Sequence, residues 1–180
     1  MKILNIFTLF LVLLGFSACE TYDDNPDVDY SSVAKMSGEW RIQVKNVNTG
    51  EKVVISTSSA GVPNYKTTIY TYNTADESTT QMWLRIGSAS APVAGAAKFG
   101  VKGKVDINLS NKTFTATGGD NTYAKGGIFN ISNGTIVLDG ADTPSGYKSD
   151  AISFTITSDL DPGVTYEITG YRRTGWPEDE

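Results

Sequence analysis

Alternation of apolar and polar residues is the feature that most constrains the fold of this chain. It is longest over residues 98–109, and shorter runs recur at 40–45, 65–73, 82–86, 128–131, 135–138, 152–156 and 164–172. Successive side chains of a strand point to opposite faces, so each run predicts a strand with one buried and one wet face. Stretches rich in Gly, Pro, Asn, Asp and Ser separate the runs, and Asn133-Gly134 and Asp161-Pro162-Gly163 are typical of hairpin turns. The pattern predicts an all-β domain of eight or nine antiparallel strands, as a barrel or a sandwich, and the long run favours a barrel with tilted strands.

The N-terminus has the layout of a secretory signal peptide that ends before Cys19. Lys2 supplies a positive charge, residues 3–16 are mostly apolar, and the small residues Ser17 and Ala18 precede the cysteine. This arrangement resembles the lipobox of bacterial lipoproteins, which implies that the chain is cleaved before Cys19 and that Cys19 becomes the acylated first residue. A membrane-spanning helix needs about 20 apolar residues, so the run is too short to span a bilayer. An ordinary secretory signal with a chance cysteine is the alternative.

We divide the chain into a signal peptide (1–18), a lipid-anchored acidic tether (19–36) and a β-barrel domain (37–180). Residues 20–29 are acidic, contain a proline and show no apolar periodicity, as expected of a linker. Acidic residues after an acylated cysteine resemble the surface-export signal of Bacteroidetes lipoproteins. The resemblance implies a bacterial outer membrane location through the N-terminal lipid and favours the cell surface over the periplasmic face.

The composition removes several classes of chemistry. The chain has no histidine and a single cysteine, so the usual nucleophile–base pairs cannot form and zinc is not expected. The acidic pairs Asp139/Asp142 and Asp159/Asp161 lack the spacing of a calcium loop and are typical of turns. We therefore predict no metal site and no cofactor. The net charge of −5 argues against a nucleic-acid partner.

The first expected strand begins with Gly38-Glu39-Trp40, and Gly-x-Trp at this place resembles the signature of the lipocalins and the wider calycin superfamily. The resemblance implies an antiparallel, up-and-down, lipocalin-like barrel of about eight strands, in which an arginine of the last strand packs over this tryptophan. Counting by twos from Val164 gives Arg172 the inward parity. We expect Arg172 to stack on Trp40 and close one end of the barrel, a cation–π contact of about 0.5–2 kcal/mol.

The two ends of the chain together resemble one family. The signal ending at Cys19, the acidic tether, the Ser37–Trp40 strand start and the closing stretch Tyr166–Glu180 are similar to Bacteroidetes lipoproteins labelled lipid-binding putative hydrolase. The resemblance implies a lipocalin-like, lipid-binding barrel. No motif in this sequence supports the hydrolase part of the label, and no catalytic residue is carried over.

Aromatic residues are the main lead to a binding site. Trp83 has the opposite parity to Met82 and Leu84, so we expect it to face outward, where it contacts a lipid or sugar or is covered by another segment. The candidate ligand or surface aromatics are Tyr70, Tyr72, Trp83 and Tyr166. The leading prediction is non-catalytic binding of a small apolar or amphipathic ligand, for which a cavity of roughly 300 Å³ or more is needed. A filled barrel that contacts a partner or glycan, and a hydrolase built on carboxylates, are the alternatives.

Overall fold

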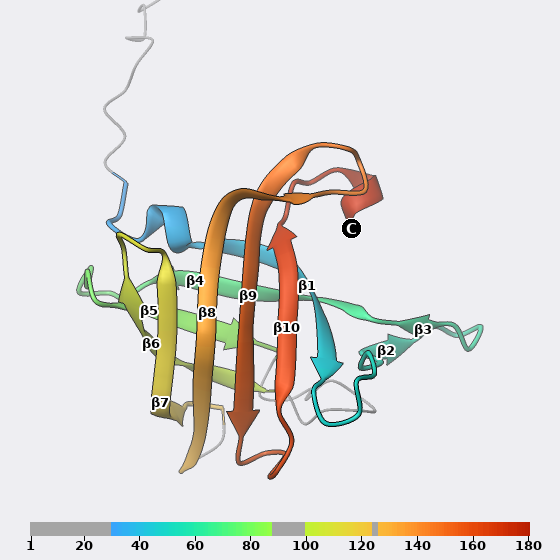
Figure 1. Ribbon diagram of the computed structural model, residues 1–180, viewed down its shortest axis with the longest axis horizontal. Coiled ribbons are helices and arrows are strands. Elements are labelled where there is room, and N and C mark those ends of the chain that lie inside the picture. Colours follow the sequence, from blue (N-terminus) through green and yellow to red (C-terminus); the bar gives the residue numbers. More distant parts are fainter. Residues whose placement is uncertain (1–29, 88–99, 124–125) are drawn as a thin grey trace, which may run out of the picture.

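Eight antiparallel strands close into one barrel in the computed structural model, which describes residues 30–87, 100–123 and 126–180 (Figure 1). The barrel strands are β1 (Gly38–Asn46), β4 (Lys66–Asn73), β5 (Gln81–Ile86), β6 (Val101–Asn108), β7 (Thr113–Asn121), β8 (Gly127–Asp142), β9 (Lys148–Ser158) and β10 (Tyr166–Arg172). Neighbours follow chain order from β4 to β10, and β1 closes the barrel by pairing with both β4 and β10. The predicted all-β, up-and-down barrel is confirmed.

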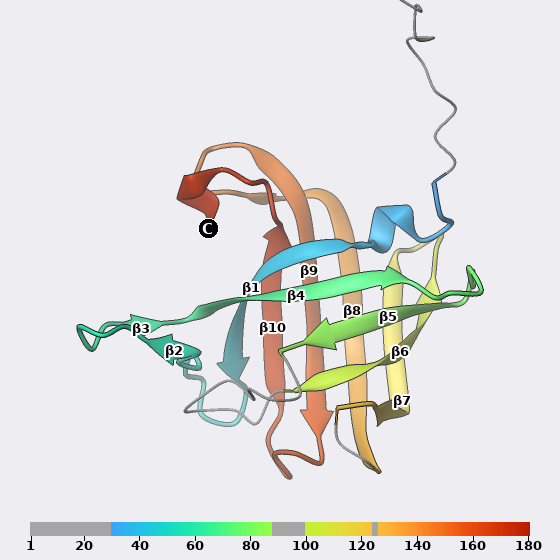
Figure 2. The same cartoon turned by 180° about the vertical axis from the view of Figure 1, so that it is seen from behind.

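Shorter elements flank the barrel: η1 (Ala34–Met36), the β2 (Ser56–Thr57) and β3 (Pro63–Asn64) hairpin, and η2 (Pro177–Asp179). The β2–β3 hairpin projects away from the barrel wall (Figure 2). Val33 and Met36 are buried, so the packed part of the chain extends N-terminal of Ser37. The expected signal peptide, Cys19 and the first part of the tether lie outside the described residues. In the part of the chain that the structure describes, no helix is long and apolar enough to cross a membrane.

The inward side chains of all eight barrel strands form one contiguous apolar cluster. Its largest fully buried members include Trp40, Phe114 and Phe129. The Phe129 ring occupies space that two glycines leave open: a Cβ atom added to Gly103 would lie 2.3 Å from Phe129 Cε1, and one added to Gly119 would lie 2.9 Å from Phe129 Cζ. Glycine at these inward positions therefore lets a large ring fill this part of the barrel.

The Asn133-Gly134 pair does not form the predicted hairpin turn, because β8 continues through it from Gly127 to Asp142. Asn133 has a φ of 55°, and the pairing of β8 with β9 shifts register between Ser132 and Thr135. These are the marks of a β-bulge, which absorbs extra residues within one strand. Gly134 lies opposite Phe114, and a Cβ atom there would come within 2.6 Å of the Phe114 ring. The glycine therefore serves close packing between strands rather than a reversal of the chain.

The other predicted hairpin turn is present. Asp161-Pro162-Gly163 lies between β9 and β10, with a φ of 80° at Gly163. The amide of Val164 donates a hydrogen bond to the Asp161 carbonyl at 3.3 Å and closes the turn. Proline and glycine here supply the backbone angles that a tight reversal requires.

Candidate functional site

The structure places Arg172 against Trp40, as expected from the parity of the last strand. The two residues are directly opposite each other on β10 and β1, and Arg172 Cζ lies 4.6 Å from the centroid of the Trp40 ring. Arg172 Nε donates to Asp150 Oδ2 at 2.9 Å, and its other nitrogens donate to the carbonyls of Ser37 and Lys35. One guanidinium therefore ties the segment before β1 to the last strands, which is a structural role.

Three of the four candidate aromatics lie together on the outer wall. Tyr70 and Tyr72 on β4 and Trp83 on β5 are half-buried, and the rings of Tyr72 and Trp83 stack with centroids 6.4 Å apart. The outward prediction for Trp83 agrees with this arrangement. Tyr166 does not belong to the surface: it is 5% exposed and packs in the core, because it shares the inward parity of Ile168.

The hydroxyl of Tyr166 donates to the Asp161 carboxylate in the β9–β10 turn. Burial raises the pKa of Tyr166 above its ordinary value, and the hydrogen bond to Asp161 and the charge of that carboxylate raise it further. The phenol therefore stays protonated, and its hydrogen bond to Asp161 anchors the turn.

A groove of about 440 Å³ opens on the outer wall beside Trp83. Its lining combines an aromatic ring, charged groups and hydroxyls from three strands: Gln81, Trp83, Lys104, Asp106, Ala116, Thr117, Gly118, Gly119, Asp120 and Thr122. The pairing of β5 with β6 puts Trp83 opposite Lys104 and Gln81 opposite Asp106. Gln81 Nε2 donates to Asp106 Oδ1 at 3.0 Å and orients that carboxylate.

An irregular part of β7 forms one side of this groove. The regular pairing of β6 with β7 covers residues 106–108 and 113–115. Beyond it, β7 shifts register against β8 twice, between Phe114 and Ala116 and between Ala116 and Gly119, and Gly118 adopts a φ of 61°. The groove lies along this bulged segment, since residues 116–120 contribute to its lining. Bulges are common where a strand must depart from a flat sheet beside a functional site.

Cationic side chains surround the aromatics on the same wall. Arg85 Cζ lies 4.9 Å from the centroid of the Tyr70 ring, and the amines of Lys102 and Lys104 lie 5.4 and 5.9 Å from that of Trp83. In the sequence these three cations are polar residues of two alternating runs, 82–86 and 98–109. Adjacent outward lysines on residues 102 and 104 were a visible signal, but their proximity to Trp83 depends on the pairing of β5 with β6.

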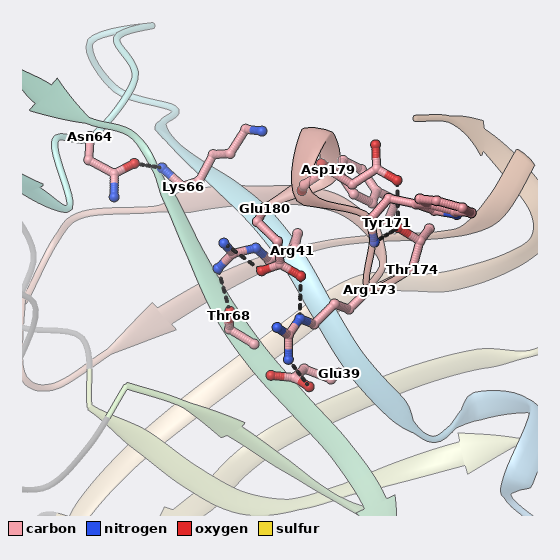
Figure 3. Close-up of polar contacts among 11 residues, drawn as sticks. Glu39, Arg41, Asn64, Lys66, Thr68, Tyr171, Arg173, Thr174, Asp179 and Glu180 are labelled. Atoms are coloured by element: carbon pink, nitrogen blue, oxygen red, sulfur yellow. Dashed lines mark hydrogen bonds and ion pairs between the residues drawn. The ribbon is translucent and has the colours of Figure 1, made fainter. Parts of the chain in front are cut away.

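A second, smaller cavity of about 210 Å³ lies on the outer face of β1, β4 and β10, lined by Arg41, Ile42, Gln43, Lys66, Thr169, Gly170 and Tyr171. Its arginine is already paired, because Arg41 contacts Glu180 at 2.9 Å and donates to Thr68 Oγ1 at 2.9 Å (Figure 3). Arg173 extends this network by pairing with both Glu180 and Glu39. Ligand pockets usually exceed about 300 Å³, so the groove at Trp83 is the better candidate.

The C-terminal residues that complete this network are fixed to the barrel. Asp179 is buried and accepts hydrogen bonds from the amide and hydroxyl of Ser145 and from the hydroxyl of Thr174. Burial alone would raise the pKa of Asp179, but the hydrogen bonds from Thr174, Ser145 and Thr143 outweigh it and hold that pKa below its ordinary value. The carboxylate thus links η2 to the β8–β9 hairpin, next to which the C-terminus lies in Figure 1.

The protein is thus a small antiparallel β-barrel, and its outer wall carries a groove lined by polar groups and one aromatic ring. Within residues 30–87, 100–123 and 126–180, no group of three His, Cys, Asp or Glu side chains is arranged to hold a metal ion. The chain belongs to the family described as lipid-binding putative hydrolase, whose model matches residues 25–177. A comparison with curated proteins finds no match. Membership of a lipid-binding family and the barrel fold are consistent with a lipid-like ligand.

Proposed function

We propose that this protein is a lipid-anchored binding protein that holds a small amphipathic, lipid-like ligand without chemical turnover. The observation that carries the proposal is the 440 Å³ groove, which joins the Trp83 ring to charged and hydrogen-bonding groups. The volume of the groove lies within the range of about 300–1,000 Å³ that is typical of small-molecule sites. The family description supports a lipid as the class of ligand.

The groove is favoured over the barrel lumen by the packing of the core. The inward side chains form one contiguous cluster, and Phe129 fits closely against Gly103 and Gly119. In small barrels the side chains themselves can fill the interior, which leaves the outer wall as the place for a ligand. On the outer wall, the ring of Trp83 offers an apolar contact while Lys104 and Asp106 offer polar ones.

We expect Trp83→Ala to weaken binding of a fluorescent amphiphile such as dansyl-undecanoic acid by about tenfold or more, since truncating a central aromatic contact costs about 2 kcal/mol. Fluorescence titration of the purified protein measures the dissociation constant. Trp176→Ala is the matched control, because Trp176 is 50% exposed and does not line the groove.

Equal affinities for the wild type and Trp83→Ala would contradict a groove site and favour a ligand in the lumen. Ester or glycoside hydrolysis that disappears in Asp106→Asn would contradict the non-catalytic part of the proposal.

The anchoring part of the proposal depends on Cys19, which is the single cysteine and follows the apolar N-terminal run. We expect Cys19→Ala to release the exported protein from membranes, because the thiol that would carry the lipid is removed. Fractionation of bacteria expressing either form measures the membrane-bound share. Ser17→Ala keeps both the cysteine and a small residue before it, so this control should stay with the membrane. Membrane retention of Cys19→Ala equal to the wild type would refute the anchor.

A further inference from the structure

We infer that the ligand of the outer-wall groove carries an anionic head group, which Arg85, Lys102 and Lys104 recognise. We call these three residues the cation row. The inference rests on the proposed function and deepens it by naming the chemistry of the ligand's polar end. The row lies on β5 and β6, which are side by side with β4 on the wall that faces the viewer in Figure 2.

The pairing of β5 with β6 brings like charges together in the cation row. Arg85 and Lys102 are directly opposite each other, and Lys104 follows two residues later on the same face. Their chain neighbours, such as Ile86 and Val101, are buried, which places the three cations on the outer face. Like charges directly opposite on one face of a sheet destabilise it. An anion between them would turn this repulsion into attraction, in a chain whose net charge is −5.

Among the described residues, the cation row lacks the carboxylate partners that five other cations have. Within the described part of the chain, none of the three forms an ion pair, whereas ion pairs to carboxylates are made by Arg41, Lys45, Lys148, Arg172 and Arg173. The charge of Lys104 does act on one acid: hydrogen bonds from Thr74 and from the backbone lower the pKa of Asp76, and the attraction of Lys104 lowers it further.

Arg85 has a further unsatisfied group. Its Nε atom is buried and has no hydrogen-bond partner among the described residues. Arg41 Nε is in the same situation. The Arg41 guanidinium is already paired with Glu180, but that of Arg85 is paired with no carboxylate in the described part of the chain. A buried donor without an acceptor is costly, and the planar guanidinium suits the oxygens of a carboxylate or phosphate.

The neighbouring residues give the ligand an orientation. Two carboxylates of the groove lining, Asp106 and Asp120, would repel an anion and so direct the head group toward the Arg85–Lys102 end. Of the cation row only Lys104 lines the groove, and Arg85 and Lys102 lie just beyond it, as the next pair on the same face after Trp83 and Lys104. A ligand that reaches this end therefore passes the Trp83 ring, which can contact its hydrocarbon part. Tyr70, which packs against Arg85, holds the guanidinium at the wall.

The test compares amphiphiles with the same chain and different head groups, each below its micelle concentration, by calorimetric titration of the purified full-length protein. We expect dodecyl phosphate to bind about tenfold or more tightly than dodecyl maltoside, and the difference to shrink as sodium chloride is raised. Lys102→Glu should abolish the preference for dodecyl phosphate over dodecyl maltoside. Arg85→Gln should reduce this preference. Circular dichroism checks that both variants are folded.

Lys52→Glu is the matched control, since it makes the same charge change at an exposed lysine outside the groove that forms no ion pair with any described residue. It should keep the preference. Equal binding of the two amphiphiles, with both weakened by Trp83→Ala, would overturn the head-group inference but leave the proposed function standing. Binding of neither amphiphile would overturn both. Inorganic phosphate that binds as tightly as dodecyl phosphate would assign the row to a free anion and overturn the inference.

Discussion

Replacing Phe129 by alanine is expected to lower the free energy of unfolding by about 3–5 kcal/mol, the range for removing a buried phenylalanine ring. Phe129 is fully buried, and its ring fills the space beside Gly103 and Gly119. Neither glycine has a side chain that could move into the vacated volume, so the cavity should persist. Urea denaturation followed by circular dichroism measures the change.

The adjacent residue provides the control for this prediction. Ile128 lies on the opposite face of β8 and is 39% exposed, so Ile128→Ala should cost less than about 1 kcal/mol. If Phe129→Ala unfolded at the same urea concentration as Ile128→Ala, the buried ring would not contribute the stability predicted for it.

Arg172→Ala is expected to destabilise the fold by about 2–4 kcal/mol, by loss of a cation–π contact and of hydrogen bonds made by a charged group. The change removes the contact with Trp40, the ion pair with Asp150 and the hydrogen bond to the Ser37 carbonyl. Trp40 is fully buried, so we also expect its fluorescence emission to shift to the red as water reaches the indole.

Arg173→Ala is the matched control at the next position. Its side chain is 42% exposed and pairs with Glu39 and Glu180 at the surface. Exposed ion pairs contribute about 0–1 kcal/mol, so this variant should remain close to the wild type in stability and emission. An effect of Arg173→Ala as large as that of Arg172→Ala would show that the contact with Trp40 has no special weight.

Part of the candidate site was predictable from the alternation of inward and outward residues along single strands. The alternation around Trp83 indicated an outward indole, and the alternation of residues 164–172 placed Arg172 inward. The groove and the cation row were not predictable, because both depend on which residue of β6 lies opposite Trp83 and on the bulged course of β7. Tyr166, the fourth candidate ligand or surface aromatic, lies in the core, in agreement with the parity that it shares with Ile168.

The sequence by itself determined that the barrel strands alternate between a buried and a wet face, since a period of two depends only on neighbours along the chain. It limited their number to eight or nine, and the structure has eight. It also determined which face of each strand is apolar. Only the tertiary structure decided what Gly103 and Gly134 do: the first makes room for Phe129 of β8, and the second lets Phe114 of β7 pack against a bulge where a turn was predicted. These roles depend on side chains that arrive from other strands. A local pattern carries no information about them, because register and bulges are set by packing between strands that are distant in the chain.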